Sequence, residues 1–127
     1  MQKIFVCLDD KNGMMFARKR QSKDRILCDK VNEMIGKETL NIVSYSQSLF
    51  PNANIVESFE EVDGFCFIEN PKYIIPEKIE KIYIFKWNRH YPADTRFNFD
   101  ISKYHMTHTE DFAGFSHENI TLEIWEN

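Results

Sequence analysis

The chain has 127 residues, and 43% of them are hydrophobic, which is enough for one domain with one core. Only 4 Gly and 4 Pro are present, so the composition excludes a long linker and argues against disorder. We therefore expect a single domain over residues 1–127. The net charge of -4, from 16 bases and 20 acids, argues against an extended nucleic acid as a partner.

The cysteine pattern indicates a reducing compartment. Cys7, Cys28 and Cys66 each lie in an apolar or helical pattern, and no two of them have the spacing of metal ligands. No apolar run approaches the length that spans a membrane, and the first residues do not form a signal peptide. We expect a soluble cytoplasmic protein that does not enter a membrane.

The first half of the chain predicts alternating strands and one helix. Residues 3–8 form a buried strand that ends at a turn-forming run. A helix follows, with Ser22 as its N-cap, Asp24 in its first turn and Gly36 as its C-terminal signal. Further strands are expected over residues 39–44, 54–58 and 64–68.

The second half predicts a central strand and a terminal hairpin. Alternation between residues 81 and 87 places Ile82 and Ile84 on one face and aromatic residues on the other, so both faces should be covered. Strands over 96–99, 104–109 and 120–125 follow, and Gly114 lies in the loop between the last two. The predicted class is α/β, with a mixed sheet, one main helix and a C-terminal β-hairpin.

A cationic segment and a polar cluster are the most informative functional features. Five bases and one acid lie between residues 17 and 25, and the chain directly after the central strand carries Asn88, Arg89 and His90. Ligands of open α/β folds usually bind at the carboxyl ends of strands. The positive charge is compensated either by an acid from elsewhere, such as Asp9, Asp10 or Glu69, or by a bound phosphate.

Several segments resemble those of dihydrofolate reductases. Residues 6–14 lead from a strand through an acidic turn to Gly13-Met14, and residues 81–97 lead from a strand to Asp94-Thr95 and Phe97. Residues 41–46 are similar to another strand of that family. The resemblance implies a truncated dihydrofolate-reductase-like fold in which Asp94 and Thr95 form a structural turn and Asp24 lies close to the position of the pterin-binding acid.

The chain departs from this family at the cofactor site. The family holds the cofactor pyrophosphate with a Gly-Gly pair after a buried strand, where this chain reads Glu69-Asn70-Pro71. Glu69 adds a like charge and Pro71 removes a backbone donor, so we expect the nicotinamide site to be lost and no cofactor to be bound.

The polar motifs are also similar to those of a group of short bacterial proteins, some of which are labelled ribonuclease Z. That label implies a metal-dependent nuclease, for which His105 and His108 are the first candidate ligands. Residues three apart on a strand point to opposite faces, so we expect no metal site. The shared motifs are residues 20–25, 45–46, 69–70, 87–94 and 114–118.

These features favour a domain that binds a small anionic or nucleotide-like ligand in a reductase-like cleft. Three alternatives remain: an NADPH-dependent pterin reductase with Asp24 as the substrate-orienting acid, a domain that binds a protein partner, and a metal-dependent nuclease. Three arginines supply positive charge, Arg89 and His90 face them from the sheet, and Tyr45 and Asn70 add hydrogen bonds. The candidate ligand-binding residues are Arg18, Arg20, Asp24, Arg25, Tyr45, Asn70, Asn88, Arg89, His90 and His117.

Overall fold

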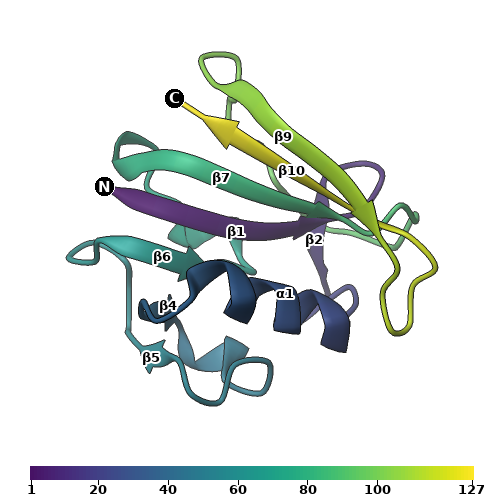
Figure 1. Cartoon of the computed structure of the whole chain (residues 1–127), viewed down its shortest axis with the longest axis horizontal. Helices are drawn as coiled ribbons and strands as arrows, with labels where there is room; N and C mark the ends of the chain where they lie inside the picture. The colour runs from purple at the N-terminus through teal and green to yellow at the C-terminus, as the bar shows by residue number, and fades with distance from the viewer.

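Seven strands form the main sheet of the computed structural model, which describes all 127 residues. The first five strands of the sheet are parallel, and β10 runs antiparallel to both of its neighbours. Figure 1 shows β1 and β7 side by side in the middle of this sheet. The strand order is β5 (Asn54–Ile55), β4 (Leu40–Ile42), β6 (Gly64–Phe67), β1 (Gln2–Leu8), β7 (Ile79–Lys86), β10 (Ile120–Glu126) and β9 (His105–Phe112).

The central strands are apolar on both faces, as the alternation predicts. Phe5 and Tyr83 are partners in the register of β1 and β7, and their rings stack at a centroid distance of 4.5 Å on one face. Ile4 and Ile82, the preceding pair, belong to the core on the opposite face. Both pairs are nearly or fully buried, so the sheet must be covered on both sides.

Helix α1 (Arg25–Ile35) covers the aromatic face. Its buried residues Leu27, Val31 and Ile35 are spaced by four, which puts them on one side of the helix. Gly36 ends the helix with a φ of 60°, a value that glycine adopts without strain. The expectation that Ser22 caps the helix is wrong, because Asp24 is the N-cap and accepts from two amides of the first turn.

The opposite face is covered by a small sheet and by loops. The small sheet has the order β3 (Lys19–Arg20), β2 (Gly13–Phe16) and β8 (Thr95–Arg96). Met14 and Met15 of β2 pack with Ile4 and Ile82 in the second core. Three short 3₁₀ helices complete the fold: η1 (Ser44–Ser46), η2 (Pro71–Tyr73) and η3 (Pro76–Lys78).

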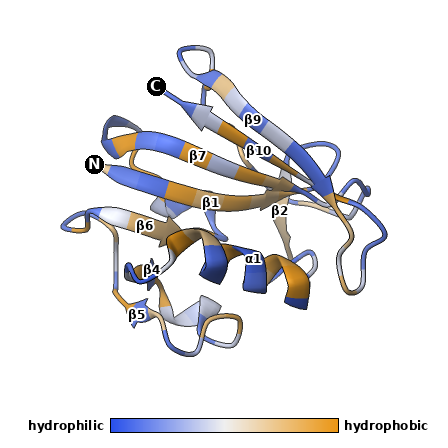
Figure 2. Ribbon diagram, in the orientation of Figure 1, coloured by the Kyte–Doolittle hydropathy of each residue, from blue (hydrophilic) through white to orange (hydrophobic).

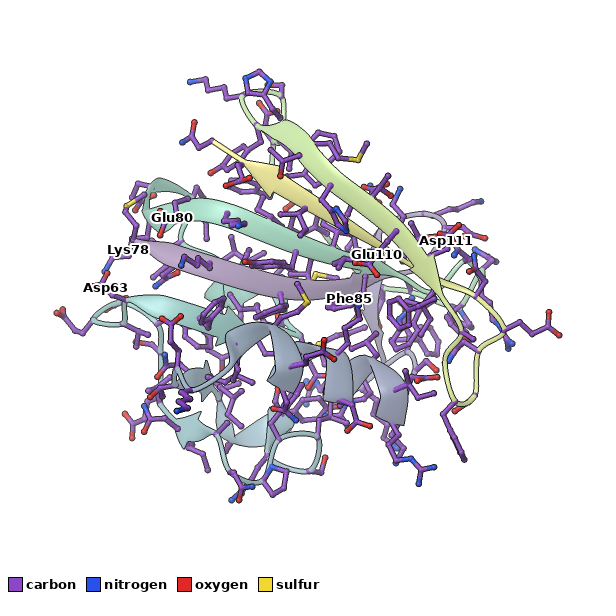
Figure 3. The ribbon with its side chains drawn as sticks, viewed as in Figure 1. Asp63, Lys78, Glu80, Phe85, Glu110 and Asp111 are labelled. Carbon is purple, nitrogen blue, oxygen red and sulfur yellow. The ribbon has the colours of Figure 1, made fainter.

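The terminal hairpin is confirmed, because β9 pairs antiparallel with β10 from His105 to Phe112, with one irregularity in register at Thr107. β9 is the edge of the main sheet, and Figure 2 shows hydrophilic colour over much of it, in contrast to the hydrophobic middle of β1. In Figure 3, Asp63, Lys78 and Glu80 lie at the amino ends of the parallel strands, and Asp111 lies toward the other end of the sheet. None of the helices has both the length and the apolar character that crossing a bilayer requires.

Candidate functional site

A buried carboxylate and imidazole join the start of α1 to the β9–β10 loop. Asp24 has a fully buried side chain, and that of His117 is 2% exposed. Oδ2 of Asp24 lies 2.9 Å from Nδ1 of His117, although the residues are 93 positions apart in the chain. The other donors to the Asp24 carboxylate are the backbone N–H groups of Ile26, Leu27, Phe115 and Ser116.

These donors determine the charge state of Asp24. Burial by itself would raise the pKa of the carboxyl group, but the hydrogen bonds from Phe115, His117, Ser116 and Leu27 together lower the pKa to about 2. Asp24 is therefore a carboxylate at neutral pH, and it can only accept hydrogen bonds. It follows that Nδ1 of His117 carries a proton.

The loop that brings His117 to Asp24 requires a glycine at position 114. A Cβ built on Gly114 would lie 2.6 Å from Oδ2 of Asp24, which leaves no room for any larger residue. The N–H of Gly114 donates to the carbonyl of His117 at 2.9 Å and closes the loop. This glycine is the local reason that the loop can pack against the start of the helix.

The far side of the His117 ring faces two hydroxyl groups. Nε2 lies 3.1 Å from Oγ of Ser22 and 3.1 Å from the hydroxyl of Tyr91. Trp87, at the end of β7, stacks on the ring with a centroid distance of 4.5 Å. The imidazole is thus fixed on three sides, and one ring nitrogen is directed at side-chain hydroxyls.

A second, partly buried network surrounds Glu69, which follows β6. Arg20 binds it in a bidentate manner, with Nε 2.7 Å from Oε1 and Nη2 2.9 Å from Oε2. Ser46 donates its hydroxyl to Oε2 at 2.7 Å, and the guanidinium lies over the Tyr45 ring at 4.5 Å. The hydrogen bond with Glu69 raises the pKa of Arg20. Of the two ways to compensate the basic segment, the internal acid is the one observed for Arg20.

A small cavity lies between these two networks. Its volume is about 20 Å³, which is close to the minimum for one water molecule. Burial raises the pKa of the Cys7 thiol, and it raises that of Cys28 to about 11, so both thiols are protonated at neutral pH. The walls include Cys7, Arg20, Gln21, Ser22, Asp24, Leu27, Cys28, Phe67, Glu69 and Trp87.

A larger cleft opens at the carboxyl ends of β4 and β6. Its volume is about 450 Å³, and it contains two cationic side chains, Arg18 and Lys72, that form no ion pair. Asn70 caps η2 by accepting from the N–H of Lys72 at 3.0 Å. The remaining lining residues are Met15, Val43, Ser44, Tyr45, Glu69, Tyr73, Asp94 and Thr95.

The structure divides the ten predicted site residues among several places. Asp24 and His117 form the buried pair, Arg20 binds Glu69, and the cleft at β4 and β6 collects Arg18, Tyr45 and Asn70. The single pocket that the sequence predicted is not formed.

The other four predicted residues lie outside both networks. Arg25 lies over the exposed Phe115 ring at 4.1 Å, and Asn88 donates to the carbonyl of Asn119 and to the hydroxyl of Thr121. The exposed side chains of Arg89 and His90 take part in no hydrogen bond or ion pair. Their role as ligand contacts stays a prediction.

Sequence reasoning missed the pairing of Ser22 and Tyr91 with His117 and the place of Lys72 and Tyr73 in the cleft. Lys72 and Tyr73 come shortly after the buried strand β6, and this position in the sequence could have indicated that they lie at the carboxyl end of the strand, where ligands bind. No signal along the chain connects residue 22 with residue 117. No group of three or more His, Cys, Asp or Glu side chains in the structure could hold a metal ion, and His108 instead lies 2.9 Å from Glu110.

The fold is that of dihydrofolate reductases. The chain is similar to a dihydrofolate reductase from Enterococcus faecalis, whose structure is complexed with NADP(H) and RAB-propyl, with a TM-score of 0.76 and 11% sequence identity. The match covers 99% of this chain and 95% of that chain. No protein-family model matches the sequence, and no curated protein matches it significantly. The likeness therefore concerns the fold alone.

Proposed function

We propose that this chain is a binding module for a small anionic or nucleotide-like ligand, held in the cleft at the carboxyl ends of β4 and β6. The observation that carries the proposal is the pair of unpaired cations, Arg18 and Lys72, in a cleft of about 450 Å³. That volume lies in the range of ligand sites, and the carboxyl edge of parallel strands is where open α/β folds bind ligands.

The charges of the cleft support an anion. Glu69 is neutralised by Arg20, so it does not oppose a negative ligand. Asp94 is the remaining acid, and its carboxylate is held by the N–H of Ala17 and the hydroxyl of Thr95. Two cations thus face one acid, and a phosphate or carboxylate would restore the balance.

The aromatic residues of the cleft support a ligand with a flat ring. Tyr45 is 41% exposed, and its hydroxyl accepts from the N–H of Arg20 at 2.8 Å, which fixes the ring. Tyr73 lies in the same cleft beside Lys72. Aromatic side chains next to cations are the usual combination for a nucleobase with its phosphate. The presence of NADP(H) in the matched reductase is consistent with a nucleotide-like ligand.

The pterin reductase alternative has less support. Asp24 would have to bind the substrate, but five donors from the chain already occupy its carboxylate. The adjacent cavity of about 20 Å³ holds roughly one water molecule and cannot hold a pterin. The protein-interaction alternative has no observation that specifies a partner for the exposed large hydrophobic residues, such as Tyr45, Met106 and Phe115.

Calorimetric titration with adenosine 5′-monophosphate, NADP⁺ and glucose 6-phosphate tests the proposal. We expect saturable binding of at least one probe, weakened roughly tenfold in Arg18→Ala and in Lys72→Ala, because each loses a charge-assisted hydrogen bond. Lys37→Ala removes an exposed cation beyond the end of α1 and should leave the affinity unchanged. No saturable binding of any probe, or equal affinity in all variants, would refute the proposal.

Two further measurements separate the alternatives. Arg89→Ala tests the larger site predicted from the sequence, and a loss of affinity would extend the ligand site to the end of β7. An absorbance assay of NADPH oxidation with dihydrofolate tests the reductase. We expect no enzyme-dependent oxidation, and a steady rate that depends on protein concentration would overturn the binding-module assignment.

A further inference from the structure

Three side chains stand in the order carboxylate, imidazole, hydroxyl. Asp24 Oδ2 is 2.9 Å from Nδ1 of His117, and Nε2 of the same ring is 3.1 Å from Oγ of Ser22. These are the contacts of an acid, base and nucleophile relay, which is recognised by geometry and not by sequence position. The adjacent Ser116 and Glu118 do not take part in it, so only the tertiary structure assembles the set.

The hydrogen-bond directions suit a base at Nε2. Asp24 accepts the Nδ1 proton, so neutral His117 has its free lone pair on Nε2. The hydroxyl of Ser22 can donate to that lone pair, and the Tyr91 hydroxyl competes for it from the same distance. Trp87 stacks on the ring and holds its plane.

Three successive backbone N–H groups, beginning with that of Ser22 itself, have no acceptor within the protein. The N–H groups of Ser22, Lys23 and Asp24 lie outside every helix and strand, and none donates a hydrogen bond within the protein. Successive free amides next to a nucleophile are the groups from which oxyanion holes are built.

The cavity beside Ser22 limits the size of what could react there. Its volume of about 20 Å³ accepts a group of about the size of one water molecule, such as the methyl of an acetyl group. Gln21 belongs to the walls of this cavity, and its Oε1 is buried without a hydrogen-bond partner. A buried acceptor of this kind is available to position a water molecule.

We propose that Ser22 is the nucleophile of an acyl-transfer site for short acyl esters, with His117 as its general base. This site is separate from the ligand cleft and does not depend on the proposed function. It extends the chemistry of the chain beyond binding.

The reaction balances with water as the only co-reactant. Oγ of Ser22 forms a bond to the acyl carbon while its proton moves to Nε2 of His117, and the same proton then goes to the alcohol oxygen as the bond between acyl carbon and alcohol breaks. Water next loses a proton to Nε2 and attacks the acyl carbon. The acid leaves, Ser22 regains its proton, and the sum is ester plus water to acid plus alcohol.

The test uses the full chain with p-nitrophenyl acetate and with a fluorophosphonate probe, followed by peptide mapping of the adduct. We expect one adduct on Ser22 and roughly tenfold slower reaction of p-nitrophenyl octanoate, because the cavity excludes a long acyl chain. Ser22→Ala should lose the adduct with both reagents. His117→Gln should slow its formation by about 10²-fold, the usual contribution of a general base.

Two variants serve as controls. Ser116→Ala removes an exposed hydroxyl in the neighbouring loop, whose side chain makes no hydrogen bond, and it should label like the unaltered chain. Tyr91→Phe keeps the ring but removes the competing hydroxyl, and labelling should be at least as fast as before. If His117→Gln does not fold, the comparison of Ser22→Ala with Ser116→Ala still decides. Absence of a Ser22 adduct, or adducts only on cysteine or lysine, would overturn the proposal.

Discussion

The carboxyl ends of the strands fall into two regions that differ in how their polar groups are used. At the ends of β1 and β7, polar side chains bind other groups of the chain: the Asp9 carboxylate accepts from the backbone N–H of Gly13 at 2.7 Å, and Asp24 binds His117. At the ends of β4 and β6, Arg18 and Lys72 have no ionic partner and line an open cleft. We call these the closed region and the open region.

The comparison of the two regions indicates where the fold leaves space for a ligand. In the closed region the acids are satisfied by the chain itself, and the space left is about 20 Å³. The ion pair of Arg20 and Glu69 lies at the boundary between the two regions. Glu69 lines both the small cavity of the closed region and the cleft of the open region. Stability should therefore depend on the closed region and ligand affinity on the open one.

Removal of the Asp24 carboxylate should have the largest effect. Asp24→Ala should lower the free energy of unfolding by about 3 to 5 kcal/mol, because it removes the helix cap and leaves Nδ1 of His117 and two loop amides buried without acceptors. Urea denaturation measures the change. Asp24→Asn, which keeps a cap, should cost less, and a loss below about 1 kcal/mol for the alanine variant would show that the buried pair is dispensable.

The free energy of unfolding should also fall at low pH, because the same carboxylate becomes protonated. The pKa of Asp24 is lowered from 3.8 to about 2 in the folded chain, so its contribution is complete above the unfolded pKa and is lost as the pH falls through the folded one. We expect a loss of about 2 kcal/mol between about pH 5 and about pH 2, measured as a shift of the urea midpoint. Asp9 also has a lowered pKa: burial by itself would raise it, but the hydrogen bonds from Gly13, Lys11, Tyr91 and Gln21 outweigh burial. Because the contribution of Asp9 to stability would be lost over a similar pH range, Asp24→Asn is needed as a control. An equal loss in that variant would assign the acid effect to other groups.

The boundary pair should show a measurable coupling. A double-mutant cycle with Arg20→Met and Glu69→Gln should give roughly 1 to 2 kcal/mol, because the pair is bidentate and its side chains are 20% and 10% exposed. The pair of Lys81 and Glu126, whose side chains are 28% and 44% exposed and whose charged atoms lie 3.7 Å apart, serves as a comparison and should give less than about 0.5 kcal/mol. Equal coupling in both cycles would mean that the partial burial of Arg20 and Glu69 has no energetic consequence.

Substitutions in the open region should have the smallest effect on the free energy of unfolding. Arg18→Ala and Lys72→Ala should each change the free energy of unfolding by less than about 0.5 kcal/mol, since neither side chain donates a hydrogen bond or forms an ion pair. Thermal denaturation without ligand measures this. A loss above about 1 kcal/mol in either variant would place that cation among the structural groups and remove the contrast between the regions.

Local patterns predicted most of the architecture. The alternation of Ile82 and Ile84 with Tyr83 and Phe85 predicted a strand with two buried faces, and both cores confirm it. Gly36 predicted the end of α1, and Gly114 marked the loop of the terminal hairpin. The small sheet escaped prediction because β2 and β3 have 4 and 2 residues, too few for a periodic pattern.

The site could be predicted only in part. The basic segment and Asp24 were recognised as polar groups near a strand end, and Glu69 was one of three acids proposed to compensate the basic segment. The histidine partner of Asp24 was not predicted. Ser22 has the residue type of an N-cap, and the sequence alone could not show that its hydroxyl instead faces a histidine 95 positions away. For Arg20 the sequence left an internal acid and a bound ligand both open, and the structure pairs Arg20 with Glu69, 49 positions away.

The sequence by itself determined the elements that arise from contacts between near neighbours: the strand periodicity, the helix face and the turn residues. The tertiary structure decided which polar groups neutralise each other and which stay open to a ligand. The reason is that hydrogen-bonded pairs across the fold depend on how distant loops close over the sheet, and no spacing along the chain records that closure.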